Sequence, residues 1–418
     1  MKIKKQSISN IVGGILVVLL VIALYKFFFL FDNRLSNIVN GAYGPSTKTL
    51  DAFSFLLLLI SILESYKIRR KCYFKEILIS EFIILIASIA SSSSTFFDKW
   101  MSYWVLLLVY LALTNWMNNE SRIKFFLFVM QASAVITNIL LIVQATILNA
   151  GGTSFLHIYF LESGYWYTYR NGMIRIAENE VLYLLSFCIS VAQIKGWTHN
   201  KKIINILAVT NIITTLINFF YVDQTRMIIS ASIFVLLFSL FASSKLTKKQ
   251  FFVRFVAIVG ISVLIGSMWN EITSILHFST TETSYTARVE GYKFFLNLGF
   301  EHPLYGVGFS RLLDSNGVNY TDVGIIGTLG QFGLILFILY IIILIKMIQM
   351  SARNQNGKSD IYKFISTNVT FIVAFLSLTT MSMFNNGLLQ VFAVALALLE
   401  TISDEVHSNS MKLKRENT

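Results

Sequence analysis

The sequence predicts an all-α protein that crosses a lipid bilayer about twelve times. Hydrophobic residues make up 55% of the 418-residue chain and charged residues only 13%, against roughly 25% charged residues in soluble domains. The apolar residues fall in long blocks rather than in the one-sided stripes of helices or strands that face water. Only two prolines interrupt the chain, so long helices are permitted.

Each apolar block is close to the roughly 20 residues that a helix needs to cross the hydrocarbon core. In chain order the predicted spans are 8–31, 50–66, 77–97, 100–116, 125–149, 176–194, 203–222, 226–243, 251–269, 323–345, 364–384 and 388–402. The first block is too long for the apolar region of a signal peptide, and no small-residue cleavage site follows it. We therefore expect it to be a span, with residues 1–418 forming a single membrane domain.

Basic residues gather in alternate loops. Most of the 34 lysines and arginines lie in segments 2–5, 67–75, 122–124, 195–202, 245–254, 346–363 and 412–415. Because positive loops stay on the cytoplasmic side, both termini are expected in the cytoplasm. This distribution explains the net charge of +12 without nucleic acid. Cys72 and Cys188, in a predicted cytoplasmic loop and a span, predict neither a disulfide nor a metal site.

Two predicted outer loops, 150–175 and 270–322, are much longer than the others, and long ordered loops tend to carry function. The first loop is rich in aromatic residues, namely Phe155, Tyr159, Phe160, Tyr165, Trp166, Tyr167 and Tyr169. In the second, 286–298 is predicted to be a short amphipathic helix with Thr286 as its cap, ended by His302-Pro303. We expect this helix to lie flat on the outer membrane surface or to roof a cavity.

Arginines stand out on the predicted outer side. Arg226 begins a span, Arg288 opens the loop helix, and Arg170 and Arg175 precede another span. Guanidinium groups bind phosphate in a bidentate manner, and a lipid diphosphate presents its charge at this depth. The alternative is that they only anchor helix ends at lipid headgroups. Asp223, three residues before Arg226, is expected to pair with it.

The segment 299–324 supplies the remaining candidate residues. Gly299 precedes His302-Pro303, and Pro303 is followed by Gly306 and Gly308, a spacing typical of a tight turn that brings backbone N–H groups close to a ligand. Asp322 lies at the mouth of the next span, where it is either catalytic or a simple complement to the helix dipole. The glycines that follow recur every three residues and favour close helix packing, at Gly324, Gly327, Gly330 and Gly333. No nucleotide-binding or metal-binding motif is present, so no cofactor is expected.

The combination of Arg288-x10-Gly299, Pro303-x-x-Gly306-x-Gly308 and then Asp322 resembles the O-antigen polymerase (Wzy) family and the related O-antigen ligases. It covers about sixty residues, and the rest of the chain is similar in topology alone. The resemblance implies a GT-C-like membrane glycosyltransferase that joins undecaprenyl-diphosphate-linked oligosaccharides into a surface polysaccharide such as O-antigen or capsule.

The resemblance also implies roles for individual residues. Arg226 and Arg288, with Arg170 or Arg175, would bind the diphosphates and stabilise the leaving group. Asp322 first, then Glu290 or His302, would assist deprotonation of the acceptor hydroxyl. The loop 150–175 departs from the family because neither of its arginines is followed by glycine at the expected spacing.

Three alternatives remain open from the sequence. A ligase transfers the finished glycan to another acceptor, but the family's His-Asn pair is replaced here by the Tyr320–Asp322 region, which favours a polymerase. A flippase for the same lipid-linked unit predicts polar residues inside the spans. A non-enzymatic assembly protein predicts that no single arginine matters. The expected partners are the lipid-linked oligosaccharide, membrane lipid and a chain-length regulator.

Overall fold

The part of the chain that the structure describes is almost entirely helical. This computed structural model describes residues 2–27, 47–65, 71–90, 96–156, 166–170, 173–177, 180–195, 202–241, 283–309, 323–355, 359–379, 384 and 388–416. Its helices are α1 (Lys2–Leu24), α3 (Thr47–Ser65), α4 (Phe74–Ala90), α5 (Phe96–Met101), α6 (Trp104–Trp116), α7 (Glu120–Asn149), α8 (Glu180–Lys195), α9 (Lys202–Ile217), the π-helix η2 (Asn218–Asp223), α10 (Arg226–Phe241), α13 (Thr283–Glu301), α15 (Gly324–Asn354), α16 (Asp360–Thr379) and α17 (Leu389–Glu416). One antiparallel hairpin joins β1 (Trp166–Arg170) to β2 (Met173–Ala177).

Each predicted span within the described residues overlaps a helix, while the predicted span 251–269 lies outside them. The predicted spans 77–97 and 100–116 do not each match one helix, because α4 ends at Ala90 and the short α5 is separated from α6 by a turn. Three of these helical segments are long and apolar enough to cross a membrane by length and composition, namely Glu120–Asn149, Lys202–Asp223 and Gly324–Asn354. Others form shorter apolar helices, including Asn10–Leu24 and Glu180–Ile194. The structure thus confirms that the described part of the chain is helical and that several of its helices are apolar enough to lie in a membrane.

The outward face of the helices is apolar, which is the reverse of a soluble protein. Along α15 the exposed large side chains are Leu334, Ile335, Ile338, Ile341, Ile342, Ile345 and Ile348. They recur at helical spacing over more than three turns. Soluble monomers rarely expose an apolar surface of this extent, so this face of α15 favours contact with lipid.

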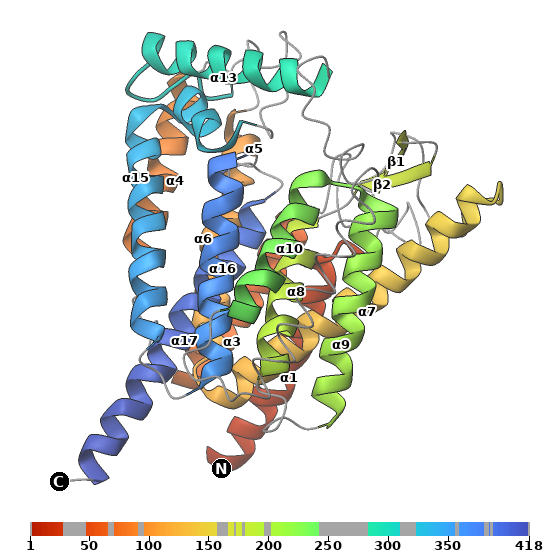
Figure 1. Cartoon of the computed structure of the whole chain (residues 1–418). Helices are drawn as coiled ribbons and strands as arrows, with labels where there is room; N and C mark the ends of the chain where they lie inside the picture. The colour runs from red at the N-terminus through yellow and green to blue at the C-terminus, as the bar shows by residue number, and fades with distance from the viewer. Residues whose placement is uncertain are drawn as a thin grey trace.

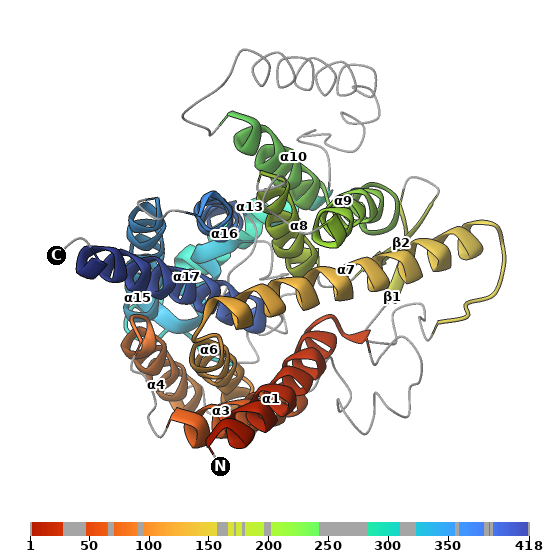
Figure 2. The same cartoon turned by 90° about the horizontal axis from the view of Figure 1, so that it is seen from below.

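The interior is built around α8, which is buried on all sides. Every described side chain from Val181 to Gln193 is buried, as expected for a helix surrounded by protein. Helices α7, α9, α10 and α16 pack against it, and Figure 2 shows α8 between them. The buried stretch of α17 contributes similarly, with its contacts to α6 and α15.

The two ends of the bundle differ. Both termini lie at one end in Figure 1, which we call the termini end, whereas α13 and the β1–β2 hairpin lie at the opposite end, the hairpin end. Helix α13 runs across the bundle over the start of α15 rather than along it. This arrangement matches the expectation of a short helix lying over one face of the membrane domain.

Several predicted boundaries are wrong. Helix α1 ends at Leu24, so the span predicted to reach residue 31 is interrupted by a turn at Tyr25-Lys26. Residues 176–177 belong to β2 and not to the next helix. Helix α13 begins at Thr283, so Thr286 lies inside it and is not its cap. It ends at Glu301, before His302-Pro303, as predicted.

Candidate functional site

The hairpin is attached to the bundle through Asn149, the last residue of α7. Its Oδ1 accepts a hydrogen bond from the backbone N–H of Ile174 at 2.8 Å, and its Nδ2 donates to the Tyr221 hydroxyl at 3.2 Å. One side chain thereby connects β2 to η2. The register pairs Thr168 with Arg175, which places Arg175 in the middle of β2, beside the π-helix.

The π-helix η2 ends in a strained turn. Gln224, which follows it, has φ 53° and ψ 28° and is buried. Its N–H donates to the carbonyl of Phe219 at 3.0 Å, which closes the wide turn. Left-handed backbone at a non-glycine residue is uncommon, and both π-turns and such strain occur often at functional sites.

Arg175 is held against the end of η2 and the start of α10. Its Nε donates to the carbonyl oxygen of Asp223 at 2.5 Å, and one terminal nitrogen (Nη2) donates to Oγ1 of Thr225 at 2.9 Å. The same nitrogen lies 3.7 Å from Oδ1 of Asp223, whose side chain is fully buried. Thr225 in turn donates to Asp223 Oδ1 at 2.8 Å. Within the described residues Nη1 makes no hydrogen bond, so the side chain, which is 23% exposed, keeps donors for a ligand.

A second cation approaches from α1. The buried ring of Tyr25 meets the ring of Tyr183 edge-on at 5.2 Å, which fixes the end of α1 beside the first turns of α8. Lys26 follows immediately with φ 54°. The charges of Lys26, Arg175 and Asp223 all act on the carboxyl of Glu180. These residues, Lys26, Arg175, Glu180, Asp223 and Thr225, form what we call the Arg175 cluster.

A buried polar network runs from below the cluster into the bundle. Asn218, the first residue of η2, donates to Asn138 at 2.7 Å, and Asn138 donates to Thr215 at 2.9 Å. Asn211 continues the network to Ser190 at 2.8 Å. These residues come from α7, α8 and α9 and are buried. Hydrogen bonds between helices inside a membrane hold the helices in one arrangement, so the network positions η2 and with it Asp223.

The second candidate region is the seam between α13 and α15. Helix α15 is broken at Gly333, with φ 79° and ψ −179°, which frees backbone groups on both sides of the break. The turn 302–309 satisfies them. Val307 and Gly308 donate to the carbonyls of Gly330 and Gln331 at 3.2 and 2.7 Å, and Leu334 donates to the carbonyl of Pro303 at 2.7 Å.

Glycines make this close approach possible. Gly306 has φ 65°, and a Cβ there would lie 2.4 Å from the backbone of Gln331. At Gly299 a Cβ would lie 2.8 Å from Leu329. The loop glycines therefore shape the turn, but the expectation that the turn's N–H groups face a ligand is wrong. Those of Gly306, Val307 and Gly308 all donate to protein carbonyls.

The structure places the other predicted residues as follows. Arg226 is the first residue of α10, and Arg170 pairs with Met173 at the end of β1. Arg288 lies in α13. The side chains of these three arginines lie outside the described part. Glu290 and His302 are exposed. Asp322 lies outside the described residues. Of the four arginines, Arg175 is the one whose contacts are described.

The sequence analysis did not single out Lys26, Glu180 or Thr225 as site residues. The expected partner of Asp223, Arg226, has a side chain outside the described part, and the structure shows that Asp223 also faces Arg175. A lone lysine inside an apolar block and a carboxylate opening an apolar helix were visible signals. Among the described residues, no group of three or more His, Cys, Asp or Glu side chains lies in position to hold a metal ion.

Chemically, the Arg175 cluster is a site for an anion. Arg175 and Lys26 carry positive charge, and α10 begins directly after Thr225, so its first N–H groups add partial positive charge. Asp223 restrains the arginine and offsets part of this charge. No protein-family model matches the chain, and no curated protein matches it. The family resemblance therefore stays a prediction carried by residues 288–324.

Proposed function

We propose that the chain is a membrane glycosyltransferase that polymerises undecaprenyl-diphosphate-linked oligosaccharides into a surface polysaccharide. In this proposal it crosses the bacterial inner membrane about twelve times with both termini in the cytoplasm. The hairpin end, with the Arg175 cluster, then faces outward. The observation that carries the proposal is the restrained Arg175 at the head of α10, at the end of the bundle that α13 covers.

The cluster suits a diphosphate leaving group. As the bond between the sugar and the diphosphate breaks, negative charge builds on the leaving oxygen. A cation that is already held in place stabilises this charge without reorganising. Arg175 is held by Asp223 and Thr225 at 2.5 and 2.9 Å. Arg226 directly follows Thr225 in the chain, and Arg288 on α13 would approach from above.

The acceptor side of the reaction needs a base for the attacking hydroxyl. Asp322 is proposed first because it adjoins the start of α15, close in sequence to the seam. Glu290 and His302 are the further candidates, and both are exposed on the covering segment. A chain-length regulator is the proposed protein partner.

The test is the length of the surface glycan in a deletion strain. The strain is complemented with wild type or with Arg175→Ala, Arg226→Ala or Arg288→Ala, at equal membrane expression. Arg353→Ala is the matched control, because Arg353 is an exposed arginine near the end of α15. Single repeat units in place of polymer are expected for the deletion and for the three variants Arg175→Ala, Arg226→Ala and Arg288→Ala, and long polymer for the control.

Other outcomes separate the alternatives. Long lipid-linked polymer that is never attached to its acceptor would make the protein a ligase. Normal polymer from all three variants would refute the proposed site and leave an assembly protein as the better description.

A flippase is the second candidate function, because the buried network of α7, α8 and α9 places polar groups inside the bundle, as a translocation path would. Its amides and hydroxyls bond mainly to one another, however, and the network from Asn218 to Ser190 contains no charged side chain. Lipid-linked units trapped on the cytoplasmic side of the deletion strain would favour this function.

A further inference from the structure

A groove opens at the termini end between α1 and α7, far from the Arg175 cluster. Its volume is about 680 Å³, within the roughly 300–1,000 Å³ of ligand pockets. One wall is apolar and comes from α1, through Ile11, Ile15, Val18 and Leu19, and Phe125 of α7 faces it. Ile11 and Ile15 are 61% and 55% exposed, so the groove is continuous with the apolar surface of the bundle.

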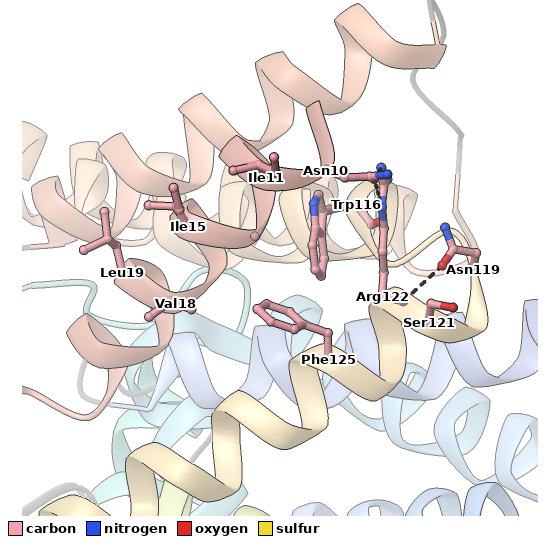
Figure 3. Close-up of a pocket in the computed structure, with 11 residues that line it drawn as sticks. Asn10, Ile11, Ile15, Val18, Leu19, Trp116, Asn119, Ser121, Arg122 and Phe125 are labelled. Carbon is pink, nitrogen blue, oxygen red and sulfur yellow. Dashed lines mark hydrogen bonds between the residues drawn. The ribbon is translucent and has the colours of Figure 1, made fainter. Parts of the chain in front are cut away.

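The other end of the groove is polar. Figure 3 shows Asn10, Asn119, Ser121 and Arg122 gathered there, away from the apolar wall. The Arg122 side chain is buried and its guanidinium is held in one position by hydrogen bonds. It donates to both oxygens of Glu64 at 2.7 and 2.8 Å and to the carbonyl of Trp116 at 3.1 Å. The groove therefore has a fixed polar end and an apolar channel.

Trp116 supplies an unsatisfied donor at this site. The residue is 2% exposed, and within the described residues its Nε1 has no hydrogen-bond partner. It lines the groove, and Figure 3 shows the indole between α1 and α7 beside the polar end. A buried donor without a partner is unfavourable, so an acceptor oxygen that reached it through the groove would be stabilised there.

We propose that this groove binds one acyl chain of an anionic phospholipid, with the glycerol and phosphate oxygens at the polar end. The chain lies along Ile15 and Val18, and an ester or phosphate oxygen accepts from Trp116 Nε1. The charge favours an anionic headgroup. Glu64 offsets Arg122, but the sequence places Lys2, Lys4 and Lys5 in the first turns of α1, and basic residues beside a membrane attract anionic lipids.

The inference rests on the membrane setting alone and not on the polymerase proposal. It concerns the opposite end of the bundle, and its readout is lipid capture rather than glycan length. Failure of one proposal leaves the other intact.

Gly14 allows the groove to be filled without disturbing the fold. A Cβ at Gly14 would meet only the Phe125 ring, at 3.8 Å, which is ordinary contact. At the neighbouring Gly13 a Cβ would lie 2.5 Å from Trp116 Nε1, so that position is unsuitable. Gly14→Leu projects its side chain into the groove, while Val12→Leu changes an exposed position of the same helix that does not line it.

The test uses the purified full-length protein in lipid nanodiscs that contain phosphatidylglycerol with a photoactivatable acyl chain. After irradiation, peptides from α1 and the start of α7 are expected to carry the lipid. Gly14→Leu should lower this labelling at least about fivefold at unchanged thermal stability, and Val12→Leu should leave it unchanged. Ile15→Trp is a second groove-filling variant, to be used if Gly14→Leu proves unstable.

The headgroup is tested by competition. Excess unlabelled phosphatidylglycerol should suppress the labelling several-fold more strongly than excess phosphatidylcholine. Equal labelling of wild type and both filled variants would overturn the groove as the binding site. Equal competition by the two lipids would overturn its preference for an anionic headgroup.

Discussion

Arg175 on β2 donates a hydrogen bond to the backbone carbonyl of Asp223 at 2.5 Å, although the two residues are 48 positions apart. Because Nε of Arg175 is bonded to a backbone carbonyl, which moves less than a side chain, the terminal nitrogens of the guanidinium are held in a fixed orientation. Arg175→Lys keeps the charge but loses this orientation. We therefore expect Arg175→Lys to give shorter surface glycan than wild type and longer glycan than Arg175→Ala. Equal glycan length for wild type and Arg175→Lys would show that orientation is unimportant.

Thr225 tests the same restraint without removing a charge. Its hydroxyl accepts from Arg175 and donates to Asp223, and hydrogen bonds to charged groups contribute about 1.5–3 kcal/mol. Thr225→Val should lower the polymerisation rate about tenfold or more, measured with lipid-linked repeat units in membranes. Thr146→Val is the control, because the exposed Thr146 hydroxyl bonds only its own helix backbone.

The break in α15 gives a stability prediction. At Gly333 the backbone has a conformation open essentially to glycine alone, and a Cβ would lie 2.5 Å from the carbonyl of Leu304. Gly333→Ala should lower the free energy of unfolding by roughly 1–3 kcal/mol through backbone strain. The steric clash with Leu304 should lower it further. The readout is the yield of monodisperse protein and its melting temperature in detergent.

Gly151 is the control for this substitution. Its φ is 78°, close to that of Gly333, but nothing lies within 4 Å of a Cβ placed there. Gly151→Ala should therefore be tolerated far better. If the two variants lost equal stability, the positive φ alone, and not the close contact with the turn 302–309, would explain why Gly333 cannot be replaced.

Helix positions could be predicted from the sequence because each apolar block is long enough to require a helix in lipid. The hairpin was missed although its signal was present. Asn171-Gly172 stands between two short runs rich in aromatic and β-branched residues, the pattern of a two-residue hairpin, and the register leaves just these two residues between Arg170 and Met173. The aromatic residues were instead interpreted as an interfacial loop.

The composition of the Arg175 cluster was beyond sequence reasoning for a different reason. Its members come from α1, β2, α8 and the end of η2, and no local pattern links Lys26 to Glu180 or Arg175 to Asp223. Hydropathy averaging also hid the network, since an asparagine such as Asn138 hardly lowers the mean of a 30-residue helix. Pairings of this kind follow from tertiary packing.

The network gives a prediction of its own. Asn138 accepts from Asn218 and donates to Thr215, so Asn138→Ala removes two interhelical hydrogen bonds at once. Such bonds contribute about 0.6–2 kcal/mol each in membranes. A lower melting temperature is expected, together with shorter glycan, because η2 is then held less firmly. Ile136→Ala, at a position 52% exposed on the same helix, should change neither.

Cys72 tests the proposed orientation. Cys72 is an exposed residue and Cys188 is buried, so a membrane-impermeant maleimide should label Cys72 from the cytoplasmic side only. Thr153→Cys in a Cys72→Ser background should be labelled from outside, since Thr153 is exposed near the hairpin end. Labelling of Cys72 in intact cells would reverse the proposed topology.

The pH dependence of that labelling is also predicted. Partial burial first, and the nearby Glu400 carboxylate second, raise the pKa of the Cys72 thiol. The reactive thiolate is therefore scarcer at neutral pH than in a free cysteine, and the labelling rate should keep rising well into the alkaline range. Glu400→Gln should shift the rate profile to lower pH, whereas an unchanged profile would contradict the influence of Glu400.

The seam between α13 and α15 has a consequence for how such a protein diverges. It is held by main-chain hydrogen bonds from the turn 302–309 to the break at Gly333 and by the buried side chains of Phe295 and Leu298 on α13. It therefore demands glycine at a few positions and apolar side chains at a few others. Exposed side chains of α13, such as Glu290, are then free to be replaced while the covering helix stays docked. A scaffold of this kind keeps its shape through extensive sequence drift, so related proteins should share the spacing of these glycines long after the residues between them have ceased to align.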